Sequence, residues 1–438
     1  MINHFEIKNF KCHEDNNHFP LPGITIVSGT NNSGKSSLLQ SIFLTTQAKG
    51  RTYPILAAND ELRIGSFSDI LNKNQPNSAT IEFSFNFDNK LLAPYGVDEF
   101  NVNLSYKNPS VFEKLPIPFF ESNPFLSSIE IVLKKEKEEH ELYSLEILDE
   151  KTNSILYKID SKYDNGYCKV EGIVPEPIIY SDVEENERVI CSSHLDIIRS
   201  ILKLVSTENI KYMKAFRVDN FVDSPNNKVS EIGLSGQNTA EVIHKYRETI
   251  ADFKFEGSDE ILTFSKVFNY WIEKLLGANY KIRSNSIDKD KFKVTIYETK
   301  TNIEYSLNQV GFGISQILPL ITLLLTSKKN DLILIENPEV HLHPKLQSLF
   351  VDLCIFVLEN DRKLVIETHS EHIINRLRFK IKENPEILSE INILFFEKDE
   401  EGFVKYSDIE LTKEGRLASW PKNFFDQTYN DLLGLIDQ

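Results

Sequence analysis

A glycine-rich loop near the start of the chain restricts the fold and the chemistry more than any other segment. Residues 29–36 read G-T-N-N-S-G-K-S and satisfy the pattern G-x-x-x-x-G-K-[ST] in full. Residues 23–27 before the loop predict a short strand, and residues 36–46 after it predict a helix. A loop in this setting directs several backbone N–H groups, and the positive end of the helix dipole, at one phosphate group. The segment therefore predicts a nucleotide-phosphate site.

The residue types in this loop have separate expected roles. Lys35 should reach the β- and γ-phosphates, and the hydroxyl of Ser36 should bind Mg²⁺. The other candidate nucleotide contacts lie in the same segment: Gly29, Asn31, Asn32, Ser33, Gly34 and Ser37. The predicted cofactors are ATP and Mg²⁺.

A site of this kind also needs an acidic residue at the end of a neighbouring strand. Residues 332–335 are four consecutive apolar residues, and Glu336 follows them directly. A carboxylate in that position would lie near Ser36 and would hold Mg²⁺ directly or through water. We therefore assign Glu336 to the predicted magnesium site.

Composition limits the cellular setting and the classes of partner. The chain has 438 residues, with 65 acidic and 49 Lys or Arg side chains, and its net charge of −16 argues against a surface covered by positive field. This net charge does not exclude a local basic groove. The four cysteines form no C-x-x-C pair, the N-terminus lacks a secretory signal pattern, and no apolar run reaches about 18 residues. We expect a cytoplasmic protein with no membrane partner.

The middle of the chain predicts antiparallel strands and amphipathic helices. Apolar and polar residues alternate over 80–87, which is typical of a half-buried strand. Further strands are expected over 128–133, 142–148 and 154–158, with a hairpin formed by 291–297 and 301–306. Helices are expected over 194–213, 239–255 and 259–276, the last with Phe264, Val267, Phe268, Trp271 and Leu275 facing inward.

The last third of the chain alternates short apolar strands with helices. Strands are expected over 332–335, 363–366 and 391–397, and helices over 313–327, 344–358 and 371–380. Such alternation implies a mostly parallel sheet that is buried on both faces.

Five segments in fixed order resemble one group of proteins. These are N-F-K at 9–11, the glycine-rich loop, V-G-F-G-I-S-Q-I-L-P at 310–319, I-E-N-P-E-V-H-L-H-P at 335–344 and E-T-H-S at 367–370. Together they resemble prokaryotic AAA-type P-loop ATPases of the ABC/SMC-head-like group related to the OLD and RecF proteins. The resemblance covers roughly the first 90 and the last 140 residues. W-P-x-x-F-F-D at 420–426 also resembles an uncharacterised C-terminal domain of one subgroup.

The resemblance implies an α/β fold and a division of the chain. The expected fold is an ABC-ATPase-like head, a mostly parallel sheet flanked by helices with an antiparallel β subdomain and an inserted α/β lobe. Residues 1–90 should form the first half of the head and 91–300 an insertion of antiparallel strands and helices. Residues 301–390 should form the second half, and 391–438 an extension that completes the head.

The resemblance also implies a composite site closed by a second copy. The opposing subunit would cap the γ-phosphate with a signature segment, and the matching residues here are Gly311, Gly313, Ser315 and Gln316. L-S-G-Q at 234–237 looks closer to an ABC signature, but we interpret it as a loop before a helix. His369 matches the histidine that senses the γ-phosphate. Lys11 matches a basic residue near the base or the phosphates.

One position departs from the pattern of ABC-type heads. There the residue after the magnesium acid is a Glu that polarises the attacking water, whereas this chain has Asn337. An amide can orient water but cannot accept its proton. Glu339 is the nearest replacement. Either Glu339 is the base, or hydrolysis is slow and the ATP-bound dimer is long-lived.

Three uses of the ATPase compete. The resemblance favours the sensor or motor of a bacterial antiviral defence system, working as a homodimer or higher oligomer that controls a separate nuclease or toxin effector. A DNA repair ATPase of the RecF kind, with DNA as partner, is the second. A nucleotide-locked scaffold, suggested by Asn337, is the third.

Overall fold

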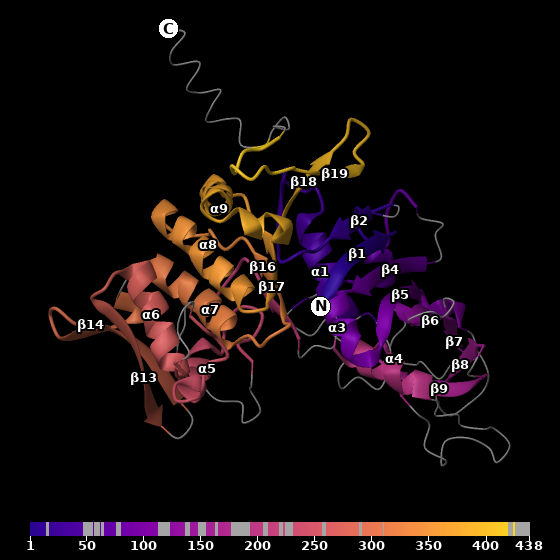
Figure 1. Cartoon of the computed structure of the whole chain (residues 1–438), viewed down its shortest axis with the longest axis horizontal. Helices are drawn as coiled ribbons and strands as arrows, with labels where there is room; N and C mark the ends of the chain where they lie inside the picture. Colours follow the sequence, from indigo (N-terminus) through magenta and orange to yellow (C-terminus); the bar gives the residue numbers. More distant parts are fainter. Residues whose placement is uncertain are drawn as a thin grey trace, which may run out of the picture. The chain divides into compact units, whose positions relative to one another are not determined.

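The computed structural model divides the chain into two compact units (Figure 1). The first comprises Met1–Leu21, Asn32–Ile210 and Lys398–Lys405, and the second comprises Pro22–Asn31, Lys211–Glu397 and Tyr406–Gln438. The structure describes residues 1–14, 17–46, 56, 62, 65–75, 80–112, 123–135, 141–147, 155–162, 165–176, 193–204, 209–218, 222–223, 231–255, 260–288, 291–309, 311–418 and 424.

A nine-stranded antiparallel sheet dominates the first unit, in the order β10-β9-β8-β7-β6-β5-β4-β1-β2. Its strands are β1 (Ile2–Lys8), β2 (Asn17–Pro20), β4 (Thr80–Phe87), β5 (Val97–Lys107), β6 (Phe125–Lys135), β7 (Glu141–Ile147), β8 (Tyr157–Ser161), β9 (Asn165–Glu171) and β10 (Val174–Glu176). The helices of this unit are α1 (Lys35–Thr46), α2 (Phe67–Ile70), α3 (Asn89–Leu92), η1 (Ala93–Tyr95), η2 (Pro109–Val111) and α4 (Ser193–Lys203).

Alternation along the strands explains why one face of this sheet is buried. Every second residue of β4 is buried, so Phe83, Phe85 and Phe87 lie on the same face. The predicted strand at 80–87 is therefore confirmed, and the predicted strands at 128–133 and 142–148 fall on β6 and β7. The sequence did not predict β5, and β8 begins at Tyr157 instead of residue 154.

The second unit contains a mixed six-stranded sheet in the order β11-β16-β17-β3-β18-β19. Its strands are β3 (Ile24–Gly29), β11 (Ile210–Met213), β16 (Leu332–Glu336), β17 (Lys363–Glu367), β18 (Ile391–Lys398) and β19 (Val404–Asp408). The four strands β16, β17, β3 and β18 run parallel. Helices α7 (Phe312–Thr326), α8 (Pro344–Glu359) and α9 (Glu371–Glu383), with η5 (Pro385–Glu390), connect or precede them. All predicted strands and helices of the last third are confirmed, within one to three residues at their ends.

A smaller antiparallel sheet and two helices complete the second unit. The sheet comprises β12 (Val222–Asp223), β13 (Tyr280–Asp288), β14 (Lys291–Glu298) and β15 (Ile303–Ser306), and the predicted hairpin is β14 with β15. The helices are α5 (Thr239–Tyr246), α6 (Phe264–Leu276) and the short η4 (Leu307–Gln309). All five residues predicted to face inward from α6 are buried.

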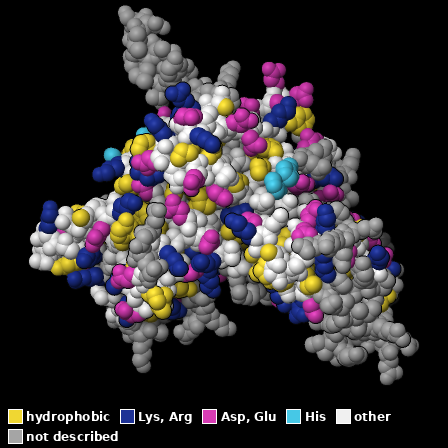
Figure 2. Space-filling view, in the orientation of Figure 1, with side chains coloured by type: hydrophobic (Ala, Val, Ile, Leu, Met, Phe, Trp, Pro, Cys, Tyr) yellow, Lys and Arg dark blue, Asp and Glu magenta, His cyan; other side chains and the backbone are white. Residues whose placement is uncertain are grey.

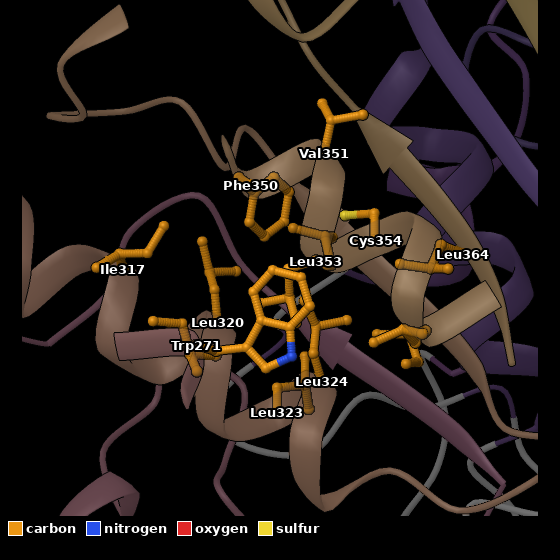
Figure 3. Close-up of a cluster of buried hydrophobic side chains, with 14 of the residues drawn as sticks. Trp271, Ile317, Leu320, Leu323, Leu324, Phe350, Val351, Leu353, Cys354 and Leu364 are labelled. Carbon is orange, nitrogen blue, oxygen red and sulfur yellow. The ribbon is translucent and has the colours of Figure 1, made fainter. Parts of the chain in front are cut away.

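The core of the second unit is built around Trp271 of α6 (Figure 3). Its ring centroid lies 5.2 Å from that of Phe356 in α8, and Leu320 and Leu324 of α7 belong to the same cluster. Burial of this many apolar side chains is the main favourable term in folding, at about 25 cal/mol for each Å² removed from water. The core therefore fixes α6, α7 and α8 against one another.

Two helix predictions were wrong at their C-terminal ends. The helix expected over 194–213 ends at Lys203, and Ile210–Met213 is strand β11 instead. The helix expected over 239–255 ends at Tyr246; Ile250 bridges to Thr263, and Phe253 stacks on Phe356. In both places tertiary pairing overrides an apolar spacing that is compatible with a helix. In the described part of the chain, no helix is both long and apolar enough to cross a membrane.

Candidate nucleotide-binding and hydrolysis site

The glycine-rich loop begins where β3 ends. Gly29 has φ +143°, and an added Cβ would lie 1.9 Å from the carbonyl oxygen of Phe396 in the adjacent strand β18. The N–H of Thr30 donates to that same oxygen at 3.0 Å. Only glycine allows the backbone this close approach, which starts the loop at the edge of the parallel sheet.

The end of the loop is held by a buried histidine of the first unit. Nε2 of His13 lies 3.2 Å from the carbonyl oxygen of Gly34, and Nδ1 lies 3.3 Å from the side-chain amide of Asn17. Because a carbonyl can only accept, Nε2 carries the proton and Nδ1 accepts. Burial lowers the pKa of His13 to about 4, so the ring is neutral at pH 7. Gly34 itself has φ +92°, with Cys12 Sγ 2.6 Å from the position of an added Cβ.

Helix α1 starts at Lys35, whose side chain is buried, and Ser36 is half-buried beside it. Two residues of the N-terminal segment contact this helix: Nζ of Lys11 donates to Oε1 of Gln40 at 2.5 Å, and Cys12 Sγ lies 4.0 Å from the Ser37 hydroxyl. The structure thus brings Lys11 to the first turns of α1. Asn31 and Asn32 are exposed at the tip of the loop, and Ser33 is buried.

The predicted acidic residue lies at the carboxyl edge of the parallel sheet. Glu336 ends β16 and is in register with Glu367 of β17, and Glu367 is in register with Val27 of β3. The strand that leads into the glycine-rich loop therefore ends at the same edge as Glu336. In open parallel sheets, ligands bind outside this edge.

The carboxylate of Glu336 is held by two donors, one in β11 and one in the segment that follows it. The hydroxyl of Tyr212 donates to Oε1, and the backbone N–H of Ala215 donates to Oε2 at 3.2 Å. Each oxygen keeps a further lone pair, because an ionised carboxylate can accept about four hydrogen bonds. The group is therefore oriented and is still able to bind a cation or an ordered water.

Asn337 adopts an uncommon backbone conformation, with φ +40°. Its N–H donates to the Glu367 carbonyl at 2.8 Å, and its carbonyl accepts from Nη2 of Arg217 at 3.0 Å. Asparagine tolerates the left-handed region better than most residues. The two backbone hydrogen bonds hold this turn directly after the acidic residue.

Glu339 lies in the turn after β16, and its side chain reaches the residues that follow β17, next to His369. Its Oε2 accepts from the Thr368 hydroxyl at 2.8 Å, and its Oε1 accepts from the backbone N–H of His369 at 2.7 Å and from Nδ2 of Asn337 at 3.4 Å. The His369 side chain is exposed. The structure therefore brings Asn337, Glu339 and His369, which the sequence assigned to hydrolysis, to one place.

The residues matched to the signature segment begin helix α7. Gly311 precedes the helix, and an added Cβ on Gly313 would lie 2.9 Å from the His341 carbonyl. Ser315 and Gln316 are buried in the following turn, and Nε2 of Gln316 donates to the Arg217 carbonyl at 3.4 Å. The L-S-G-Q segment forms turns before α5, as predicted.

The H-L-H-P segment has a structural role at one of its histidines. Nδ1 of His343 accepts from the N–H of Lys345 at 3.3 Å and so caps the N-terminus of α8. This contact gives His343 a structural role as the N-cap of α8.

Sequence analysis missed Tyr212, Ala215 and Arg217, because Tyr212 lies within the segment predicted to be helical and the other two follow it directly. Arg217 is 2% exposed, and burial lowers its pKa to about 10, opposed by the charges of Glu339 and Glu336. The available sequence signal was the alternation of apolar Ile210, charged Lys211 and aromatic Tyr212, which is typical of a short strand.

Residues 1–374 match the family described as AAA ATPase domain. The chain belongs to this ATPase family. Residues 389–435 match a second family, described as a protein of unknown function (DUF3696). Most of the W-P-x-x-F-F-D motif lies outside the described residues; Phe424 is buried and packs edge-on against Phe395 of β18.

Two comparisons extend this assignment. The chain is 22% identical over 411 residues to endonuclease GajA of Bacillus cereus (strain HuB5-5). The matched region covers 81% of this chain and 52% of GajA. The chain therefore spans about half the length of that relative. A crystal structure of an SMC head bound to the C-terminal winged-helix domain of ScpA matches with TM-score 0.51, 13% identity and coverage of 94% of this chain and 98% of that one.

A further SMC head, from Pyrococcus furiosus and bound to the C-terminal domain of ScpA, matches with TM-score 0.48, 13% identity and coverage of 100% of this chain and 99% of that chain. The first match establishes the fold class predicted from the sequence. The AAA ATPase domain of this chain has the α/β fold of an SMC head, with a large sheet flanked by helices.

Proposed function

We propose that this AAA ATPase binds MgATP through its glycine-rich loop and hydrolyses it in an ATP-closed homodimer. The observation that carries the proposal is the arrangement at the carboxyl edge of the parallel sheet. There the start of the loop follows β3, and Glu336 ends a strand two places away with its carboxylate held by Tyr212 and Ala215. A phosphate-binding loop and an oriented acid at one sheet edge are the two components that MgATP binding requires.

Ser36 and Glu336 are the residues that would hold Mg²⁺. Both supply oxygen atoms, which are the ligands that Mg²⁺ prefers, and the ion would neutralise phosphate charge as the reaction proceeds. The lone pairs left on Glu336 after its two hydrogen bonds suit a direct or a water-mediated contact. Lys35 and the loop residues Gly29, Asn31, Asn32, Ser33, Gly34 and Ser37 would bind the phosphates, with Lys11 close to the base or the phosphates.

Hydrolysis in this proposal depends on Asn337, Glu339 and His369. The Asn337 amide would orient the attacking water, and Glu339 would accept its proton. Three hydrogen bonds orient the Glu339 carboxylate. Because Asn337 replaces the glutamate usual at its position, and an amide cannot accept the proton of the water, we expect turnover to be slow. His369 would sense the γ-phosphate from the end of β17.

A second copy would complete the site through its signature segment. Gly311 and Gly313 begin α7, and the hydroxyl of Ser315 and the amide of Gln316 lie in its first turns. A helix N-terminus presents N–H donors and a positive dipole end, both of which suit a terminal phosphate. ATP would then join two subunits, and its hydrolysis would release them.

We infer a role in antiviral defence from the resemblance of the five segments in fixed order to the OLD-related ATPases, and the similarity to GajA, whose name describes an endonuclease, suggests a nuclease as the effector. In this proposal the ATPase controls a separate nuclease or toxin effector, as the resemblance to the OLD-related ATPases implies. A DNA-maintenance ATPase of the RecF type is the second candidate. On the face drawn in Figure 2, the described acidic and basic side chains are interspersed, which favours a protein partner over an extended DNA contact.

The test is ATP turnover by the purified chain, measured with its molecular mass in the presence and absence of ATP. Turnover with ATP-dependent dimerisation supports the proposal, and Lys35→Ala should abolish binding and turnover while leaving the circular dichroism spectrum unchanged. Normal ATP binding by that variant would exclude the assigned loop. Binding and dimerisation without turnover would favour a nucleotide-locked scaffold.

A further inference from the structure

Arg217 is a buried charge whose hydrogen-bonding capacity is only partly used. Its Nη2 donates to the Asn337 carbonyl, whereas Nε and Nη1 have no hydrogen-bond partner among the described residues. Burying a guanidinium in this way costs free energy that complete pairing would offset. The side chain is therefore poorly explained by stability alone, and it lies beside Glu336 and Glu339.

The backbone of Arg217 is tied to the first turns of α7. Nε2 of Gln316 donates to the Arg217 carbonyl at 3.4 Å, and the loop is anchored on both flanks. The N–H of Lys214 donates to the Leu234 carbonyl at 2.8 Å, and the N–H of Val218 donates to the Ser235 carbonyl at 2.9 Å. A shift of the start of α7 would therefore displace residues 214–218, a short segment held at both ends by backbone hydrogen bonds.

The side chain of Arg217 acts on the turn that carries the hydrolysis residues. Asn337 has φ +40°, a sparsely populated conformation that persists only when its surroundings hold it. The Asn337 amide in turn donates to Glu339. Without Arg217, the Asn337 carbonyl would keep only the N–H of Val340, at 3.3 Å, as a donor from the described part of the chain, and the Asn337 amide would be less firmly oriented against Glu339.

We propose that Arg217 is a positioning residue that couples the signature turn of α7 to the Asn337–Glu339 turn of the same subunit. Gln316 contacts its backbone, and its guanidinium holds Asn337, so contact of the signature turn with ATP on the opposing subunit alters hydrolysis in this one. The inference rests on the proposed function, because it requires that Asn337 and Glu339 act on the attacking water.

The test compares Arg217→Met and Arg217→Lys in the full-length chain, by ATP affinity and by turnover. Arg217→Met removes the charge and keeps the apolar stem. We expect its kcat to fall about 30-fold or more, with the Kd for ATP within about threefold of wild type, since supporting residues commonly contribute 10- to 100-fold. Arg217→Lys should recover part of the loss. If folded Arg217→Met has the same kcat as the wild-type chain, the proposal is overturned.

The split between ATP affinity and turnover separates positioning from a merely structural role. A structural defect would weaken ATP binding and turnover together, whereas loss of positioning should lower kcat and leave the Kd for ATP near its wild-type value. A parallel loss of ATP affinity and kcat in Arg217→Met contradicts the inference. Arg362→Lys is the matched control, because Arg362 is a second buried arginine that bonds Asp252 and Ser327 at the opposite end of β17. Arg362→Lys should lower the urea midpoint and leave kcat near that of wild type.

Coupling to α7 is tested by a double-mutant cycle with Gln316→Ala. If the two residues act through one path, the effect of Gln316→Ala on kcat should largely disappear in the Arg217→Met background, where the side-chain link to Asn337 is absent. Additive effects would overturn the coupling. Absence of ATP turnover by the wild-type chain would instead overturn the proposed function, and this inference with it.

Discussion

The hydroxyl of Tyr212 donates a hydrogen bond to Oε1 of Glu336, a residue 124 positions later in the chain. The backbone N–H of Ala215 donates to the other carboxylate oxygen at 3.2 Å. Together these two donors fix the plane of the carboxylate at the end of β16. A carboxylate that binds a metal ion is usually oriented by hydrogen bonds from residues that do not themselves contact the metal.

Tyr212→Phe should weaken Mg²⁺ binding and leave the fold intact. The variant removes one donor and leaves Oε1 without that partner, and we expect the Mg²⁺ concentration for half-maximal ATP turnover to rise about tenfold. Tyr143→Phe is the control, because the Tyr143 hydroxyl donates to Glu141 in the nine-stranded sheet. An unchanged Mg²⁺ dependence in Tyr212→Phe would show that this hydrogen bond does not serve the metal site.

Asn337→Glu, which introduces the residue usual in ABC-type heads, should fail to accelerate hydrolysis. Asn337 has φ +40°, where glutamate is disfavoured by roughly 1 kcal/mol, and the new carboxylate would face that of Glu339. We expect a lower urea midpoint and a kcat no higher than wild type. Aspartate tolerates this backbone conformation better than glutamate. Asn337→Asp therefore separates the effect of backbone strain from that of charge repulsion with Glu339. A tenfold gain in kcat by the glutamate variant would contradict the prediction.

Glu339→Gln should abolish turnover while ATP binding persists. A general base contributes typically about 10²- to 10⁴-fold, so we expect kcat to fall by at least about 100-fold and an ATP-bound dimer to accumulate. Thr368→Val is the control, because it removes the donor to Oε2 and keeps the carboxylate. Turnover of Glu339→Gln within twofold of wild type would exclude Glu339 as the base.

His13 should make stability depend on pH below neutrality. Its pKa is about 4 in the folded chain and near 6.5 in the unfolded chain, so the unfolded chain binds more protons between these values. The contribution of His13 is therefore fully present above pH 6.5 and is lost as pH falls towards 4, by about 3 kcal/mol at most.

The measurement is the urea midpoint across this pH range, for wild type, His13→Gln and His18→Gln. Glutamine at position 13 does not titrate, so the slope with pH should decrease in that variant. His18 is exposed and pairs with Glu6, and its replacement serves as the control. Equal slopes for wild type and His13→Gln would exclude His13 as the source.

Local patterns were sufficient for the parts of the site that lie within one segment. The glycine-rich loop, the buried strand before Glu336 and the strand before His369 each follow from a short run of residues. A short apolar run between helical patterns is typical of a strand buried on both faces. The order of these runs also predicted the parallel sheet, because each helix is long enough to return the chain for a parallel pairing.

Pairing between distant segments could not be predicted. The spacing of Ile201, Leu202, Ile210 and Met213 is compatible with one helix, and only pairing with β16 makes Ile210–Met213 a strand. The consequence is functional, since this strand carries Tyr212 and leads to Arg217. His13 likewise showed no local sign of its hydrogen bond to Gly34.

The sequence by itself therefore determined the proposed chemistry: which residues are assigned to phosphate, which acid is assigned to the metal and which position departs from the ABC pattern. These properties depend on residue type and on spacing within a few turns of chain. Only the tertiary structure decided how the acid and its neighbours are held, through Tyr212, Ala215 and Arg217. Those contacts join residues 120 or more positions apart, and only burial of the intervening core brings such residues together.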